Sequence, residues 1–91
     1  MIADAIIQGF CKKNEFLSQT EVFNLIIWTP VRAAVSYIIY RDAALSNVAG
    51  TTTSTEFKDH NRGPGLYDYY LVSVSNSGTE TLRGHITVRC P

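Results

Sequence analysis

The sequence lacks an excess of charge of either sign. Its 91 residues include eight Lys or Arg and eight Asp or Glu, so the formal net charge is zero. Proteins that bind nucleic acid or an anionic membrane surface present clusters of basic residues, because their ligands carry phosphate groups. The scattered, balanced charges therefore predict no nucleic-acid partner.

Long hydrophobic runs are also absent. The longest apolar run is Leu25-Ile26-Ile27-Trp28, whereas a bilayer-spanning helix needs about 20 apolar residues. The first ten residues lack the basic leader and long apolar stretch of a secretory signal. We therefore expect no membrane span and synthesis in the cytosol, with the product ending in an extracellular, spore-surface or virion assembly.

Catalytic and metal-binding motifs are the third absence. The sequence contains no Cys-x-x-Cys pair and no Gly-x-Ser-x-Gly that would position a nucleophile. His60 follows Asp59 in a polar segment and His85 stands alone, so neither belongs to a cluster with the spacing of metal ligands. We interpret both histidines as surface residues and expect no enzymatic activity, no metal ion and no cofactor.

What the sequence does contain is a series of stretches rich in β-branched and aromatic residues. A Pro64-Gly65 turn precedes one of them, and Asn76-Ser77-Gly78 separates it from the last. Such stretches bounded by turns are typical of antiparallel strands. The sequence therefore predicts an all-β fold, an antiparallel two-sheet sandwich of about seven strands, immunoglobulin-like or jelly-roll, over residues 19–91. The clearest strands are expected at residues 20–29, 35–40, 66–75 and 80–90.

The segment after Thr29 has a second interpretation. Thr29 could cap a helix that has Pro30 at its first position, with Val31, Ala34 and Ile38 on one face. The β-branched and aromatic residues of 35–40 favour a pleated surface instead, and we therefore predict a strand.

Residues 20–29 are apolar on both faces of the expected strand. One face carries Phe23, Leu25 and Ile27. The other face is unusually apolar for a surface in contact with solvent, and we expect it to meet the N-terminal segment or another subunit. The candidate subunit-facing residues are Val22, Ile26 and Trp28.

Alternation is most regular in the last strand. Leu82, Ile86, Val88 and Cys90 share one face, which the period of two predicts to be the core face. The intervening residues of that strand, such as Arg83 and His85, are expected to point to water.

Residues 1–18 are expected to form an N-terminal arm that docks in a neighbouring copy of the chain. Its apolar residues are Ile2, Ile6, Ile7 and Phe10. The spacing of Ile2, Ile6 and Phe10 also fits one face of a helix, so the conformation of the arm is open. The Thr- and Ser-rich residues 51–55 lack the charges that usually protect an edge strand, and the arm could pair with that edge.

The strand and turn motifs resemble those of fibronectin type III and related immunoglobulin-like domains. The resemblance covers roughly residues 20–90 and is carried by residues 37–42, 53–59, 64–70 and 76–78. It implies the sandwich fold and indicates no ligand. Ala43 stands where the family usually has Gly, and the paired inner-strand cysteines of antibody domains are missing.

The positions of the two cysteines are similar to those in self-assembling bacterial fibre subunits such as endospore appendage proteins. Cys11 lies in the expected arm and Cys90 near the end of the chain. In such subunits arms reach neighbours and are locked by disulfides, although only one arm cysteine is present here. The residues themselves leave three alternatives open: free thiols, a disulfide between subunits, or a disulfide within the chain.

We therefore predict a non-enzymatic structural subunit that forms homo-oligomers or polymers, as a fibre or as a shell or decoration protein. The alternative is a small module that binds a carbohydrate or a peptide. In that case the aromatic platform would come from Trp28 or from the tyrosines, whose faces can stack on sugar rings. These tyrosines are Tyr37, Tyr40, Tyr67, Tyr69 and Tyr70.

Overall fold

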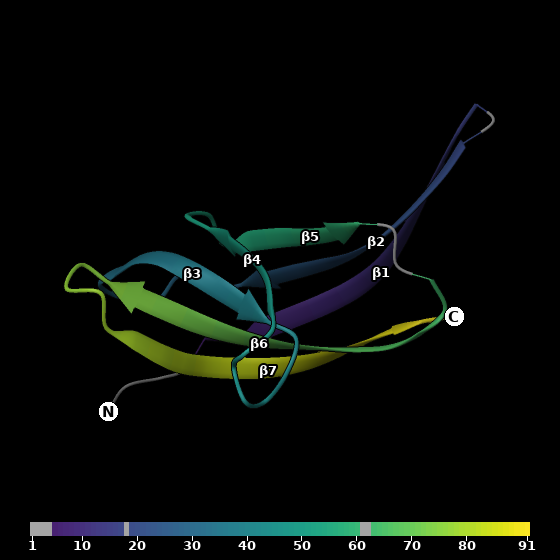
Figure 1. Ribbon diagram of the computed structural model, residues 1–91. Helices are drawn as coiled ribbons and strands as arrows, with labels where there is room; N and C mark the ends of the chain where they lie inside the picture. The colour runs from purple at the N-terminus through teal and green to yellow at the C-terminus, as the bar shows by residue number, and fades with distance from the viewer. Residues whose placement is uncertain (1–4, 18, 61–62) are drawn as a thin grey trace.

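Seven β-strands form two antiparallel sheets that pack against each other (Figure 1). The computed structural model describes residues 5–17, 19–60 and 63–91. One sheet has the order β1-β2-β5 and the other β4-β3-β6-β7, which confirms the predicted all-β sandwich. The strands are β1 (Ile7–Phe16), β2 (Gln19–Trp28), β3 (Ala34–Tyr40), β4 (Val48–Thr52), β5 (Glu56–His60), β6 (Gly65–Ser75) and β7 (Glu80–Cys90). In the described part of the chain, no helix long and apolar enough to cross a membrane is found.

The segment after Pro30 is a strand, as its β-branched residues predicted, and β3 pairs with both β4 and β6. The Thr- and Ser-rich segment differs from the prediction. It does not form one edge strand but connects two, since β4 ends at Thr52 in one sheet and β5 begins at Glu56 in the other. The polar stretch that follows, from Lys58 onwards, continues β5 to His60. It can do so because Asp59, which points inward, has polar partners in the buried Tyr69 and the half-buried Arg41.

The expected N-terminal arm contributes the first strand of the sandwich. β1 pairs with β2 along its whole length, from Ile7 opposite Trp28 to Phe16 opposite Gln19. The open question of its conformation is thus answered for residues 7–16, which are extended. Ile2 lies outside the described residues.

The inward face of β2 is the one that we expected to meet the arm or another subunit. Ile26 and Trp28 are 1% and 5% exposed, and both belong to the core between the sheets. The expectation that they face a second subunit is therefore wrong. Because β2 is apolar on both sides, its alternation alone did not distinguish the inner face from the outer face. Val22, which was expected on the same face, lies toward the N-terminal end of β2 and is only half-buried.

β7 follows the predicted alternation at its C-terminal end but not at its beginning. Val88 and Cys90 are buried, whereas Leu82 is 48% exposed. The register between β6 and β7 shifts after the Leu71–Gly84 pair: the next pair is Val72 with Leu82, so β7 carries one extra residue, Arg83, at this point. A β-bulge breaks the alternation, so that residues on its two sides no longer follow one pattern of facing. Leu82, which precedes the bulge, therefore does not belong to the core row of Ile86, Val88 and Cys90.

The core lies between the two sheets and is largely aromatic and aliphatic. Trp28 and Tyr37 pack edge to face, with their ring centroids 5.2 Å apart. The Tyr37 hydroxyl accepts a hydrogen bond from the backbone N–H of Val31, so its polar atom is satisfied. The buried cluster consists of Ile26, Trp28, Tyr37, Ile39, Tyr69, Leu71 and Val88.

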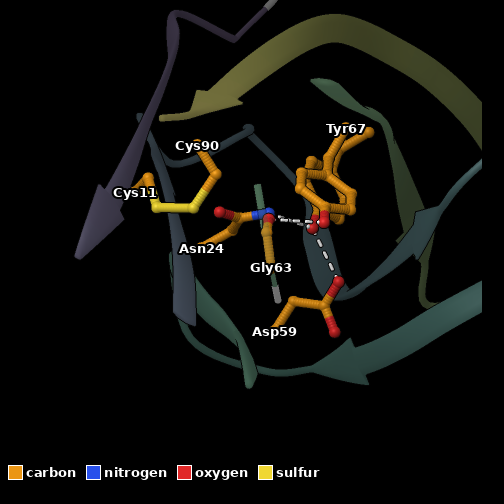
Figure 2. The surroundings of a disulfide bond; sticks show 7 residues. Cys11, Asn24, Asp59, Gly63, Tyr67 and Cys90 are labelled. Carbon is orange, nitrogen blue, oxygen red and sulfur yellow. Dashed lines mark hydrogen bonds between the residues drawn. A yellow bond between two sulfur atoms is a disulfide. The ribbon is translucent and has the colours of Figure 1, made fainter. Parts of the chain in front are cut away.

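The first and last strands meet in a close seam. A Cβ on Gly9 would lie 2.5 Å from Cγ2 of Val88, and a Cβ on Gly84 would lie 2.5 Å from Cδ1 of Ile7. Because neither glycine has a Cβ, β1 and β7 approach each other more closely here than they could if these residues carried side chains. Further along the seam, Cys11 and Cys90 form a disulfide within the chain (Figure 2). Of the three alternatives for the cysteines, the structure therefore shows the disulfide within the chain, and not free thiols or a disulfide between subunits.

We expect Gly9→Ala to lower the free energy of unfolding by about 1–3 kcal/mol, because the added methyl group overpacks the seam against Val88. Gly63→Ala is the matched control, since a Cβ there would have no atom within 4 Å. Urea unfolding of both variants measures the difference. Equal stability of the two would show that the seam can expand at no cost.

Removing the disulfide is expected to lower the free energy of unfolding by about 4.5 kcal/mol. The bond joins residues 79 positions apart, and a cross-link restricts the unfolded chain more as the loop becomes longer. Urea unfolding of the Cys11→Ser/Cys90→Ser variant, compared with the oxidised protein, gives the value. Reductant should have no effect on the variant, and an oxidised protein no more stable than the variant would contradict the account.

Candidate interaction face

The outward face of the three-stranded sheet is unusually apolar. Asn24, Ile26 and Trp28 of β2 point into the core, so the alternate residues Phe23, Leu25 and Ile27 point away from it. The register places Phe10 of β1 opposite Leu25. Ile6, just before β1, is 70% exposed and Phe10 is 40% exposed. We call this surface the outer face; its apolar residues are Ile6, Phe10, Phe23, Leu25 and Ile27. Of these, Leu25 and Ile27 are half-buried and Phe23 is 7% exposed.

Charged residues of both signs border the outer face. The Lys12 amine lies 5.2 Å from the centroid of the Phe10 ring, and the Lys58 amine lies 5.4 Å from that of Phe23. In these positions the lysine stems cover part of the rings while the amines reach solvent. Glu56 is opposite Ile27 in the register, and Glu21 contacts His60 Nε2 at 3.0 Å.

An apolar outer face is exceptional for an antiparallel sheet. Such sheets are usually apolar on the core side and polar on the solvent side, but β2 is apolar on both. Contiguous exposed apolar surface rimmed by polar residues marks sites of protein contact. The outer face can therefore bind another surface by hydrophobic contact.

The sequence-predicted site residues divide between the two sides of this sheet. Of the arm residues, Ile6 and Phe10 reach the outer face, whereas Ile7 points inward and packs beside Gly84. The outward residues Leu25 and Ile27 were not predicted to be functional. The signal that could have identified them was the apolar character of both faces of residues 20–29.

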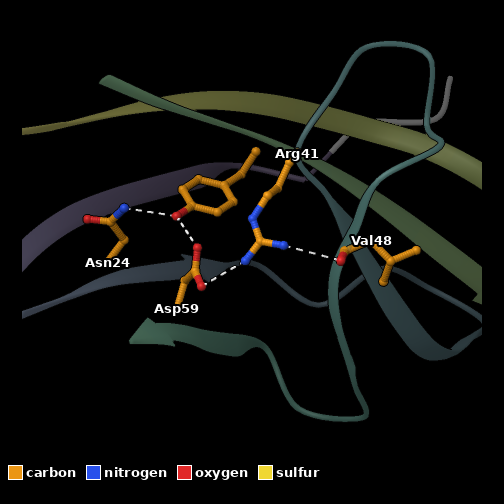
Figure 3. A network of polar contacts seen from close by, with 5 residues as sticks. Asn24, Arg41, Val48 and Asp59 are labelled. Atoms are coloured by element: carbon orange, nitrogen blue, oxygen red, sulfur yellow. Dashed lines mark hydrogen bonds and ion pairs between the residues drawn. The ribbon is translucent and has the colours of Figure 1, made fainter. Parts of the chain in front are cut away.

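A buried polar network lies inside the sandwich (Figure 3). The Tyr69 hydroxyl donates to Asp59 Oδ2 at 2.6 Å and accepts a hydrogen bond from Asn24 Nδ2 at 2.8 Å. Arg41 donates to Asp59 Oδ1 at 3.0 Å and to the carbonyl of Val48 at 3.3 Å. The network thus links β2, β5 and β6 to the connection between β3 and β4. Arg41 balances the charge of the Asp59 carboxylate, and Arg41 and Tyr69 bind its two oxygens. We therefore interpret Asp59 as a structural residue and not as a catalytic base.

A second polar cluster lies on the opposite sheet. The Tyr70 and His85 rings stack with centroids 4.4 Å apart, and Asp68 accepts hydrogen bonds from Thr87 at 2.6 Å and His85 at 3.2 Å. The hydrogen bond from Thr87, followed by that from His85, lowers the pKa of the Asp68 carboxyl.

Trp28 is buried and is therefore not the exposed platform that we considered for a carbohydrate. The same holds for Tyr37, Tyr40 and Tyr69.

Among residues 5–17, 19–60 and 63–91, no three His, Cys, Asp or Glu side chains gather closely enough to hold a metal ion. No family model, curated protein or solved structure matches the chain. The assignment of function therefore rests on the geometry of its surfaces.

Tyr69→Phe is expected to lower the free energy of unfolding by about 1–3 kcal/mol, because it removes a hydroxyl that both Asn24 and Asp59 use inside the protein. Tyr67→Phe is the control. Its hydroxyl donates to the carbonyl of Gly63 at 2.6 Å (Figure 2), but that bond is exposed and water can replace it. Thermal and urea unfolding measure both variants, and a loss as large for Tyr67→Phe would contradict the importance of the network.

Proposed function

We propose that this protein is a non-enzymatic structural subunit that assembles with copies of itself through the outer face. The observation that carries the proposal is the apolar surface formed by the exposed Ile6 and Phe10, just before and within β1, and by the half-buried Leu25 and Ile27 of β2. In water this surface has an unfavourable free energy that contact with a second apolar surface removes.

The charges around the outer face suit a second copy as the partner. Two lysines, Lys12 and Lys58, and two glutamates, Glu21 and Glu56, surround the apolar residues. Two copies of a face with balanced charge can approach each other without net repulsion. Two such faces meeting around a twofold axis form a self-complementary contact, the commonest kind in homo-oligomers.

Disulfides persist in oxidising environments, so the Cys11–Cys90 bond supports assembly outside the reducing cytosol. This agrees with an extracellular, spore-surface or virion assembly. Because Cys11 and Cys90 are paired with each other, the proposed contact between copies is non-covalent.

The test is the molar mass of Phe10→Ser in solution. If the outer face holds copies together, this variant weakens association at least about tenfold, since a Phe side chain contributes about 1.5–3 kcal/mol when it is buried. Leu66→Ser is the matched control, because Leu66 is 70% exposed but lies on the other sheet. Sedimentation equilibrium of both variants, each checked for folding by circular dichroism, gives the result. Equal association of the two variants would overturn the proposal.

A carbohydrate- or peptide-binding module is the second candidate function. The observation that favours it is the stack of the half-buried Tyr70 on the exposed His85, beside the Asp68 carboxylate. An aromatic surface next to hydrogen-bonding groups can bind a sugar ring. A glycan array probed with the protein and with Tyr70→Ala would separate the two candidates, because loss of array binding in the variant is expected only for the module.

A further inference from the structure

The β1–β2 hairpin extends beyond the rest of the sandwich (Figure 1). β5 pairs with β2 only from Phe23 to Ile27, and β7 ends at Cys90, which is bonded to Cys11. Residues 13–16 and 19–22 therefore pair with each other and with no other described strand. We call these residues the ribbon.

The ribbon has an unpaired edge along β1. From Lys12 to Phe16, the side of β1 that faces away from β2 has no described strand beside it. Every second residue of an edge strand points its N–H and C=O groups away from the sheet, where they can pair with another strand. A two-stranded ribbon is also only marginally stable in water and gains from a third strand. Leu17 at its tip is 95% exposed.

The charges on this edge complement a second copy of the same edge. Lys13 and Glu15 lie on the same side of β1, with Lys13 Nζ 3.4 Å from Glu15 Oε1, and their side chains are 61% and 70% exposed. If two such strands pair antiparallel with Asn14 opposite Asn14, each Lys13 lies opposite the Glu15 of the other copy. Oppositely charged residues directly opposite each other stabilise a strand pair.

We propose that two copies of this chain join edge to edge through antiparallel pairing of residues 12–16 of β1. The two ribbons then form a four-stranded intermolecular sheet with a twofold axis at Asn14. The alternative is that the lysines protect the edge against any pairing, as exposed lysines do on many edge strands. The glutamate two residues after Lys13 favours pairing, because it removes the repulsion that the lysines alone would cause.

This joint deepens the proposed self-assembly, and its consequence for polymers rests on that proposed function. The edge contact and the outer-face contact use different surfaces and different twofold axes. Copies that join alternately through two such contacts extend beyond a dimer, either as an open chain or as a closed ring, depending on how the two axes are placed. The edge contact alone would form a dimer of twice the 10.1 kDa chain mass.

Charge exchange tests the edge contact directly. Glu15→Lys makes the edge basic at both positions, Lys13→Glu makes it acidic at both, and each variant alone should associate at least about tenfold more weakly than the parent through this joint. An equimolar mixture of the two variants should associate again as a heterodimer, and the double variant Lys13→Glu/Glu15→Lys should associate with itself. All are made in the Phe10→Ser background, in which the outer-face contact is weakened, and are measured by sedimentation velocity.

The same background separates failure of this inference from failure of the proposed function. Dimers of Phe10→Ser that are lost in Glu15→Lys and recovered in the mixture would support the edge contact, even if the outer face proved inactive. Monomeric Phe10→Ser at all concentrations would overturn the edge contact, and so would dimers that neither charge variant weakens. The outer-face proposal is then judged separately, from association of Glu15→Lys in the chain that retains Phe10.

Discussion

The contact between the first and last strands is the constraint on which the rest of this structure depends. The sheets of a 91-residue sandwich share a small core, and a domain of this size buries only part of its chain on folding. Here β1 closes against β7 because Gly9 and Gly84 allow close approach, and the Cys11–Cys90 disulfide fixes the two strands together. The bond joins one edge of the three-stranded sheet to one edge of the four-stranded sheet. The core residues between the sheets are thereby held in contact.

This closure also determines which surfaces are available to a partner. Because Cys11 is bonded to Cys90 at the end of β7, the part of β1 before Cys11 packs along β7, whereas the part after it projects with β2 as the ribbon. Pairing with β2 directs Ile6 and Phe10 outward, where they extend the apolar residues of β2. The segment expected to be a separate arm thus holds these apolar side chains in a fixed position. A preorganised surface loses less conformational entropy on binding than a flexible arm does.

The positions of the strands could be predicted from the sequence, but the directions of several side chains could not. β-Branched and aromatic residues identified β3, β6 and β7, because they suit a pleated surface. For β2 the pattern was ambiguous, since an apolar residue stands at nearly every position from Val22 to Trp28. The bulge at Arg83 reversed the direction of Leu82, and only the pairing with β6 reveals it. Burial of Asp59 depends on Arg41 and Tyr69, which are distant in sequence. The resemblance to fibronectin type III domains stays a prediction.

The most direct test of self-assembly is the molar mass of the untagged, oxidised protein over a wide range of concentrations. Sedimentation equilibrium, with negative-stain electron microscopy of the same samples, gives both the mass and the form of any assembly. The account predicts a mass that rises with concentration beyond that of a dimer, accompanied by extended chains. A constant mass of 10.1 kDa at every concentration, with no particles larger than the monomer, would contradict it.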